Sequence, residues 1–498
     1  MNTDINERQT LIRGLGLIAA VSVIIGNVIG TGVFFKARIM TCNVGEPMWV
    51  VAAWIAAGLL ALAGSLTYAE LTAMKPQASA EYVLLRDSYG KVSSFLYGWM
   101  QLFIAKTGSM AALAVAFAIA LNSYLDQALG YTLLSIPVGS SSFDITTLQI
   151  IAIMSIIIFT TLNTASVALS GQIATFLTFI KVALVILVGV GAFLFVTGGS
   201  FANFGLEASA GCLDVTESQR YGHANYSFLA GFAAAMFGAL WGYDGWNQLT
   251  FVAGEVKEPN RNIPLAIIGS TIVIIVLYVF IHVAYFYVLS PTAIASVDKD
   301  VAVANVIVEK FFAGDVATFA TGVAVALFTM GLMLSSLGSL HTSILAGGRV
   351  PYAMAKDGLF FSRFANLSVN AVPISSLVLQ GAWAIVLLLS DSLWRLYDPE
   401  NALFDTLTNY VVFGSFIFYG LITSTVFIFR RRFPDAERPY RTFGYPIVPV
   451  IFLVVTAWLL LQTLYDDPVN SLIGIALILL GLPVYFYLTR SKSETDAG

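Results

Sequence analysis

Charged side chains are scarce in this sequence. Asp, Glu, Lys and Arg make up 11% of its 498 residues, whereas 58% of the residues are hydrophobic. Soluble domains carry about 25% charged residues. A single soluble core stops growing near about 250–300 residues, so a chain of this length could not hide so much apolar surface from water. The composition therefore excludes an ordinary soluble protein and predicts an integral membrane protein in contact with a lipid bilayer.

Cysteine is nearly absent as well. Only Cys42 and Cys212 occur, and two such residues form neither a disulfide framework nor a metal-ligand pattern. A disulfide between them is one possibility, but we expect two unpaired thiols. The sequence has no H-E-x-x-H, P-loop or nucleophile-elbow motif, so we expect no enzyme activity, no metal and no cofactor. The net charge of −4 and the lack of a basic patch argue against a nucleic-acid partner.

Long apolar runs fill most of the chain. A membrane-spanning helix needs about 20 mainly apolar residues. About twelve runs meet this criterion, at 14–38, 48–72, 93–124, 146–169, 173–197, 226–251, 264–289, 316–344, 374–391, 403–429, 446–465 and 470–490. The first run is longer than the apolar part of a signal peptide, so we expect it to remain as the first span. The fold class predicted is an all-α membrane protein.

The distribution of Lys and Arg predicts the orientation, because these residues accumulate on the cytoplasmic side. With the N-terminus inside, 17 of the 25 Lys and Arg residues fall on the inner side and six on the outer side, leaving Lys106 and Lys181 within spans. An odd number of spans would destroy this bias. We therefore expect both termini in the cytoplasm and the protein in the cell membrane.

Glycine interrupts two spans at corresponding places. The first span contains Gly26-Asn27-Val28-Ile29-Gly30-Thr31-Gly32, and the sixth contains Gly238-Ala239-Leu240-Trp241-Gly242-Tyr243-Asp244-Gly245. Paired interruptions of this kind indicate a substrate site in transporters built from inverted repeats. Unwound turns expose N–H and C=O groups that lipid cannot satisfy. A half-helix N-terminus suits a carboxylate and freed carbonyls suit an ammonium group, so the site matches a zwitterion.

Close helix packing is the alternative interpretation of each glycine cluster, since Gly26-xxx-Gly30 fits a contact motif of membrane helices. Two clusters at equivalent positions favour the functional interpretation. On this basis we expect a cytoplasmic tail at 1–13, a first repeat at 14–197, an extracellular loop at 198–225, a second repeat at 226–429, a cytoplasmic loop with the last two spans at 430–490, and a cytoplasmic tail at 491–498.

Ionisable groups within the spans also require explanation, because a charge in a membrane costs several kcal/mol. Lys181 is about 12 Å along the fifth span at about 1.5 Å per residue, and we expect its ammonium to bond to carbonyls of the first span. Asp244 either lines the cavity or caps the second half of span six, and we favour the cap. Ser339 and Ser343 share one face and could hold a substrate or ion against span one.

Five stretches of the sequence form a distinctive set: GNVIGTGVFF (26–35), YAEL (68–71), WGYDGWNQLTFVAGEVKEPNRNIPLA (241–266), GSLHTSILAGGRVPYAMAKDG (338–358) and RRRFPDAERPYRTFGYPIVP (430–449). Together, and in this order, they resemble the L-type amino acid transporter family of the amino acid–polyamine–organocation superfamily. The resemblance implies a LeuT-type five-plus-five inverted repeat with discontinuous helices 1 and 6. It also implies transport of neutral amino acids, usually by exchange.

Carried over by position, the resemblance implies roles for individual residues. Ile29, Gly30, Thr31 and Gly32 would form the carboxylate cradle. Ile29, Trp241 and Gly242 would face the amine. Independently of the resemblance, the position of Ser339 on the face it shares with Ser343 makes it a further candidate for substrate binding. Trp241 would also be the aromatic gate above the substrate. Lys181 would stand in for the sodium ion of related ion-coupled carriers, which implies sodium-independent transport.

The sequence departs from the family pattern in places. Eukaryotic members join a single-span glycoprotein through an outer cysteine after the third span, but residues 125–145 contain none. We therefore expect a free-standing bacterial-type carrier with no disulfide-linked heavy chain. Asp244 replaces a glycine of some members, and Trp241 is bulkier than the more usual Phe, so the preferred side chain stays open.

The sequence thus favours a sodium-independent exchanger of neutral L-amino acids that works by alternating access. One alternative is proton-coupled uptake through a change in the charge of Lys181. Another is a carrier of cationic amino acids or polyamines, which depends on Asp244. A membrane sensor that binds amino acids without moving them is a third, although the eight residues after Arg490 leave no room for a signalling domain.

Overall fold

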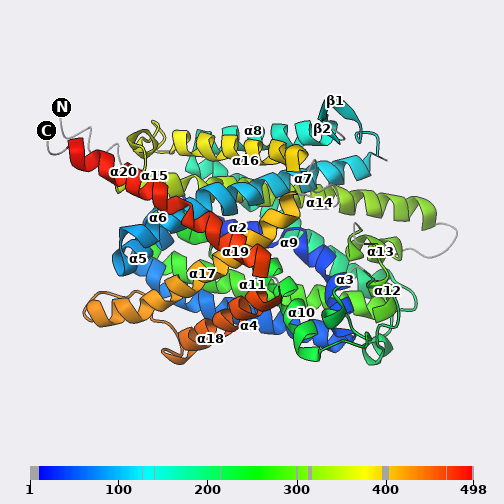
Figure 1. Ribbon diagram of the computed structural model, residues 1–498. Helices are drawn as coiled ribbons and strands as arrows, with labels where there is room; N and C mark the ends of the chain where they lie inside the picture. The colour runs from blue at the N-terminus through cyan, green and yellow to red at the C-terminus, as the bar shows by residue number, and fades with distance from the viewer. Residues whose placement is uncertain are drawn as a thin grey trace.

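The computed structural model is built almost wholly of α-helices (Figure 1). It describes residues 11–125, 127–138, 141–213, 215–298, 301–311, 317–394, 403–466 and 468–495. The predicted all-α fold is confirmed. The only β-sheet in these ranges is a two-stranded antiparallel hairpin.

The elements follow one another in two stretches of the chain. Up to the second interruption they are α2 (Leu17–Val28), α3 (Gly32–Val44), α4 (Pro47–Met74), α5 (Ala80–Tyr89), α6 (Lys91–Met100), the π-helix η1 (Gln101–Ala105), α7 (Lys106–Tyr124), β1 (Thr132–Val138), β2 (Ser141–Thr146), α8 (Thr147–Ala165), α9 (Val167–Phe195), η2 (Phe201–Gly205), η3 (Glu217–Gln219) and α10 (Phe228–Tyr243). From there they are η4 (Gln248–Glu255), α11 (Pro259–Val288), α12 (Pro291–Ala295), α13 (Val303–Glu309), α14 (Ala317–Gly347), α15 (Arg349–Lys356), η5 (Ser362–Ala365), α16 (Ile374–Trp394), α17 (Leu403–Arg432), α18 (Ile447–Asp466), α19 (Pro468–Leu479) and α20 (Gly481–Thr495).

The long apolar helices account for most of the expected spans. Within the described ranges, ten are long and apolar enough to cross a membrane, and α2 with α3 makes an eleventh that bends by 41°. The expected sixth span is α10, which has only 16 residues and continues through a turn into the 3-10 helix η4. An uninterrupted span needs about 20 residues. The interruption after Tyr243 therefore leaves α10 too short to cross a membrane by itself.

The first helix, α2, starts on the same side of the helix bundle on which the last helix, α20, finishes. Leu15, just before α2, pairs with Val256 after η4, and η4 packs against α5. In Figure 1, α5, α15 and α20 lie at one end, whereas β1, β2, α12 and α13 lie at the opposite end. Within the described residues, α2 therefore starts at the end of the bundle where α20 finishes.

The expectation that Cys42 and Cys212 are unpaired is wrong, because the two form a disulfide with a Cα–Cα distance of 5.5 Å. The segment after η2 folds back over the end of α3. Ala208 donates its N–H to the Gly45 carbonyl at 2.9 Å, and Tyr221 donates to that of Cys42 at 2.9 Å. This return of the chain brings together two cysteines separated by 170 positions, which their spacing could not reveal.

Two ion pairs, each with a fully buried carboxylate, join elements at the end that holds α5. Arg349 and Glu255 are fully buried and bond at 2.8 and 3.0 Å. Glu70 accepts from Arg430 at 3.0 and 2.7 Å. Taking charges out of water is costly unless their hydrogen bonds are satisfied, and both pairs are bidentate Arg–carboxylate contacts of the strongest kind.

Candidate functional site

The first span is unwound between α2 and α3. The peptide after Val28 leaves helical geometry, with ψ of 89° at Ile29, and Gly30 donates its N–H to Val28 at 2.8 Å. In the described part of the chain, no backbone carbonyl accepts from the N–H groups of Thr31, Gly32 or Val33. These three donors form the N-terminus of α3, where the helix dipole is positive, and they therefore suit an anionic group.

The sixth span is interrupted after Tyr243. Asp244 is extended, with ψ of 138°, and Gly245 has a φ of +97°, a conformation that favours glycine. A Cβ on Gly245 would also overlap the side-chain amide of Asn27. The glycine therefore lets the interruption of span six (the second break) come close to the unwound turn of span one (the first break).

Tyr278 of α11 joins the two breaks. Its hydroxyl lies 2.9 Å from the carbonyl oxygens of both Val28 and Gly242, and the side chain is fully buried. Trp241 covers Gly32, where a Cβ would lie 2.7 Å from the indole ring. The structure thus brings the predicted residues of spans one and six into one place.

Lys181 of α9 contacts the last turn of α2, next to the first break. Its ammonium donates to the Gly26 carbonyl at 2.6 Å and to the Ser339 hydroxyl at 2.7 Å, and the side chain is fully buried. Ser339 also lies 3.1 Å from the Gly26 carbonyl. These contacts stabilise the ammonium with neutral oxygen atoms and fix the end of α2.

The polar residues of α14 line the same side of the first break. Ser335 donates to the Ile29 carbonyl at 3.3 Å, and Ser343 donates to the Asn27 side-chain oxygen at 3.1 Å. Asn27 was not singled out from the sequence, although it lies inside the interrupted stretch. The sequence feature that could have identified it is a side-chain amide in the middle of an apolar span, because a buried amide needs hydrogen-bond partners.

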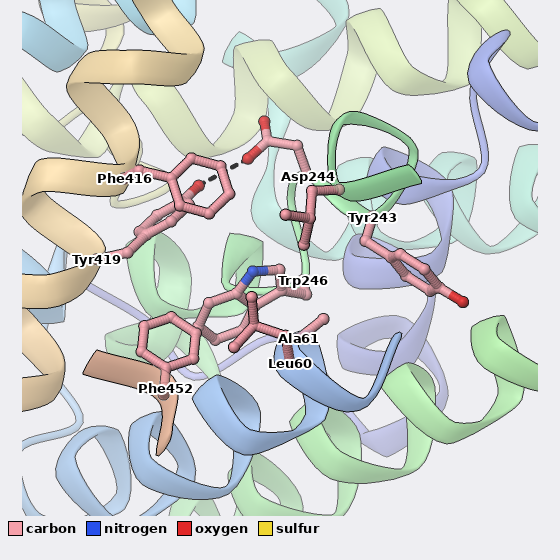
Figure 2. A pocket seen from close by; sticks show the side chains of 9 residues that line it. Leu60, Ala61, Tyr243, Asp244, Trp246, Phe416, Tyr419 and Phe452 are labelled. Atoms are coloured by element: carbon pink, nitrogen blue, oxygen red, sulfur yellow. Dashed lines mark hydrogen bonds between the residues drawn. The ribbon is translucent and has the colours of Figure 1, made fainter. Parts of the chain in front are cut away.

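The expectation that Asp244 caps the second half of span six is wrong. The residue before η4 is Asn247, and the Asp244 carboxylate instead accepts a hydrogen bond at 2.8 Å from Tyr419 of α17. Figure 2 shows Asp244 and Tyr419 turned toward each other, with Tyr243 pointing away from them. The cap was expected from the local sequence, but the carboxylate is instead bound by Tyr419, which comes from a helix distant in the sequence.

Asp244 is one of the residues that line a small pocket (Figure 2). Its lining is mostly aromatic and aliphatic: Leu60, Ala61, Leu240, Tyr243, Asp244, Trp246, Phe416, Tyr419 and Phe452. An acid among aromatic rings is a chemical environment that attracts organic cations. The pocket lies directly beside the second break, since Tyr243 and Asp244 belong to both.

A buried polar network continues from the second break toward α5. The Glu81 carboxylate accepts from Tyr97 at 2.6 Å, from Asn247 at 2.6 Å and from Thr250 at 2.7 Å. Lys106 donates to Gln248 at 2.6 Å. The π-helix η1 ends just before Lys106. Glu81 could not be recognised from the sequence, because it lies in a polar segment between spans.

Two neighbouring ion pairs connect α5 to other segments at the same end of the helix bundle. Asp87 binds Lys75 and Arg86, the latter at 2.9 Å. Burial raises the pKa of Asp87, but the hydrogen bonds from Lys75 and Arg86 outweigh burial and leave this pKa below its ordinary value of 3.8. Arg86 also bonds Asp357 at 2.6 Å. No group of three His, Cys, Asp or Glu residues suited to a metal occurs among the described residues.

Comparisons with known proteins agree with this architecture. A family model described as amino acid permease matches residues 15–486. The b(0,+)-type amino acid transporter 1 of Mus musculus is 26% identical over 494 residues, covering 98% of this chain and 90% of that protein. The large neutral amino acids transporter small subunit 2 of Oryctolagus cuniculus is 29% identical over 476 residues, covering 95% and 79%. Since the family model matches nearly the whole chain, this chain belongs to the amino acid permease family.

Proposed function

We propose that this permease exchanges neutral L-amino acids across the cell membrane without sodium. The observation that carries the proposal is the pair of facing interruptions in spans one and six. The N–H groups at Thr31, Gly32 and Val33, which lack backbone acceptors, would bind the substrate carboxylate. Carbonyls at Ile29 and Gly242 each keep a second lone pair and would accept from the ammonium group.

Two further residues, Gly30 and Trp241, complete the proposed site. Gly30 leaves the approach to the first break open, because a Cβ there would lie 3.6 Å from Ser339 and contact nothing else. Trp241, whose ring covers Gly32, would close the site as a lid. Alternating access would then follow from movement of the two interrupted spans relative to the scaffold helices.

Lys181 supports sodium independence. Its ammonium occupies the position between the Gly26 carbonyl and the Ser339 hydroxyl, two neutral oxygens of the kind that bind sodium. A fixed cation there repels a second one. Lys181 would thus act as the built-in cation of the site and hold α2 in its binding conformation.

The surroundings of the site support the rest of the proposal. The positive-inside pattern, together with α5, α15 and α20 at one end, favours cytoplasmic termini, an outer loop at 198–225, and repeats at 14–197 and 226–429. Because Cys42 and Cys212 bond to each other, neither thiol is left for a covalent heavy chain. We therefore propose a carrier without a disulfide-linked partner.

Uptake into proteoliposomes tests the proposed exchange. We expect labelled neutral amino acid to enter rapidly only when the vesicles are preloaded with unlabelled amino acid, and equally well with sodium or choline outside. An imposed pH gradient should have no effect. Uptake that needs no internal substrate and follows the proton gradient would instead support coupling through Lys181.

A second candidate is transport of cationic amino acids or polyamines, and the Asp244 pocket is the observation that favours it. The aromatic lining and the carboxylate would suit a substrate ammonium or guanidinium group. One relative bears the name of a b(0,+)-type transporter and another that of a large neutral amino acid transporter, so both classes deserve a test. Competition by arginine or putrescine against a labelled neutral amino acid distinguishes them, because neither competes with a strictly neutral carrier.

A further inference from the structure

A lysine lies in the seam between the outer halves of the two interrupted spans. Gly32, Lys36 and Met40 are spaced four apart on α3, so they share one face of the helix. Both flanking positions contact α10: a Cβ at Gly32 would lie 2.7 Å from the Trp241 ring, and a Cβ at Gly238 would lie 3.5 Å from Met40. A charged side chain in the middle of such a helix contact needs a compensating partner.

One partner of Lys36 is the Trp241 ring. The Lys36 ammonium lies over the indole, 4.6 Å from its centroid. A cation within about 6 Å of an aromatic face is attracted by the ring, and Trp provides the strongest attraction. The same ring packs against Gly32 one turn away, so α3 contacts Trp241 at two successive positions of one face.

We propose that Lys36 is a positioning residue that latches the Trp241 ring over the substrate site and slows its opening toward the outside. This inference rests on the proposed function, in which Trp241 is the lid, and it adds the group that holds the lid closed. Loss of the latch should let the lid open more often. External substrate would then leave more easily, so its apparent KM would rise, while turnover would rise if lid opening limits it.

A different role for Lys36 would be a positive charge that attracts substrate carboxylates to the entrance. The two roles differ in two measurable ways. A charge acting through space is screened by salt and works whether or not the ring is present. A latch requires the ring and changes access for every solute, whatever its charge.

Chemical modification of a single thiol measures lid opening directly. Both natural cysteines are in the disulfide, so Ser335→Cys, next to the first break, adds one free thiol at the site. Cationic and anionic methanethiosulfonate reagents that do not cross the membrane are added outside. With Lys36→Gln we expect both reagents to react about two- to fivefold faster. This increase corresponds to the free energy of the one cation–π contact that is lost.

Lys36→Arg is the matched control, because guanidinium also stacks on aromatic faces, and its thiol should react at the parent rate. An unchanged rate in Lys36→Gln would overturn the latch. A faster rate for the cationic reagent with a slower rate for the anionic one would also overturn it, in favour of the entrance charge.

A double variant tests the dependence on the ring. In a Trp241→Leu background, Lys36→Gln should change the rates no further, because its target is gone. A full additional effect would contradict the latch. The thiol assay needs no transport, so absence of amino acid exchange by the wild-type protein would count against the proposed function alone.

Discussion

The Lys181 ammonium lies 2.6 Å from the carbonyl oxygen of Gly26, at the point where the first span is about to unwind. Its other acceptor, Ser339, comes from α14. One buried cation therefore connects an interrupted helix to two continuous ones. This connection couples the conformation of the first break to the scaffold.

Replacing Lys181 by Ala should reduce transport more than it affects folding. Hydrogen bonds to charged groups are each worth about 1.5–3 kcal/mol, so we expect exchange to fall by about tenfold or more. Monodisperse elution and thermal stability report the folded state, and proteoliposome exchange reports activity. Wild-type exchange by a properly folded Lys181→Ala protein would refute the role assigned to the ammonium.

Replacing Gly245 by Ala should destabilise the site. The residue has a φ of +97°, and a Cβ would overlap the Asn27 amide, so we expect a loss of about 1–3 kcal/mol and a lower melting temperature. Gly269→Ala is the control, because a Cβ at Gly269 contacts nothing within 4 Å. Equal melting temperatures for the two variants would show that the breaks do not approach each other in this way.

Removing the disulfide should lower stability without abolishing the fold. The Cys42–Cys212 bond closes a segment of 170 positions, and such bonds typically contribute about 2–4 kcal/mol. Cys42→Ser, Cys212→Ser and the double variant should share one lowered melting temperature, and a reductant should lower only that of the wild type. A reductant effect that persists in Cys42→Ser would mean that the two cysteines are not paired.

Acid should weaken the contact of α5 with the end of α4. Since the pKa of Asp87 is held below 3.8 in the folded protein, its stabilising contribution is complete above pH 3.8 and is lost as the pH falls through the lowered value. Asp87→Asn should remove this contribution at every pH. The protection of 75–90, measured as exchange relative to the intrinsic rate at each pH, should therefore fall below about pH 4 in the wild type and stay constant in the variant. Parallel acid curves would contradict the assignment to Asp87.

Local composition was enough to predict the general architecture. The apolar runs predicted the spans, and the glycines from Gly26 to Gly32 and from Gly238 to Gly245 predicted the interruptions, because both signals are contained in a few consecutive residues. Lys181 was recognisable for a similar reason, as a charge surrounded by apolar neighbours.

What the sequence could not predict depends on segments that meet only in the folded chain. Cys42 meets Cys212 because an outer loop folds back over α3. Asp244 is bound by Tyr419 from a distant helix rather than capping its own. Tyr278, which joins the two breaks, is one aromatic residue among many in an apolar run, and nothing local distinguishes it.

The central claim is that bare peptide groups at the two interruptions hold both charged ends of an amino acid. Competition against labelled substrate in proteoliposomes by a neutral amino acid, its methyl ester and its N-acetyl derivative tests this claim most directly. The ester lacks the carboxylate that the α3 N-terminus would bind, and the N-acetyl form lacks the ammonium. We predict competition by the free amino acid alone. Equal competition by either derivative would contradict the account.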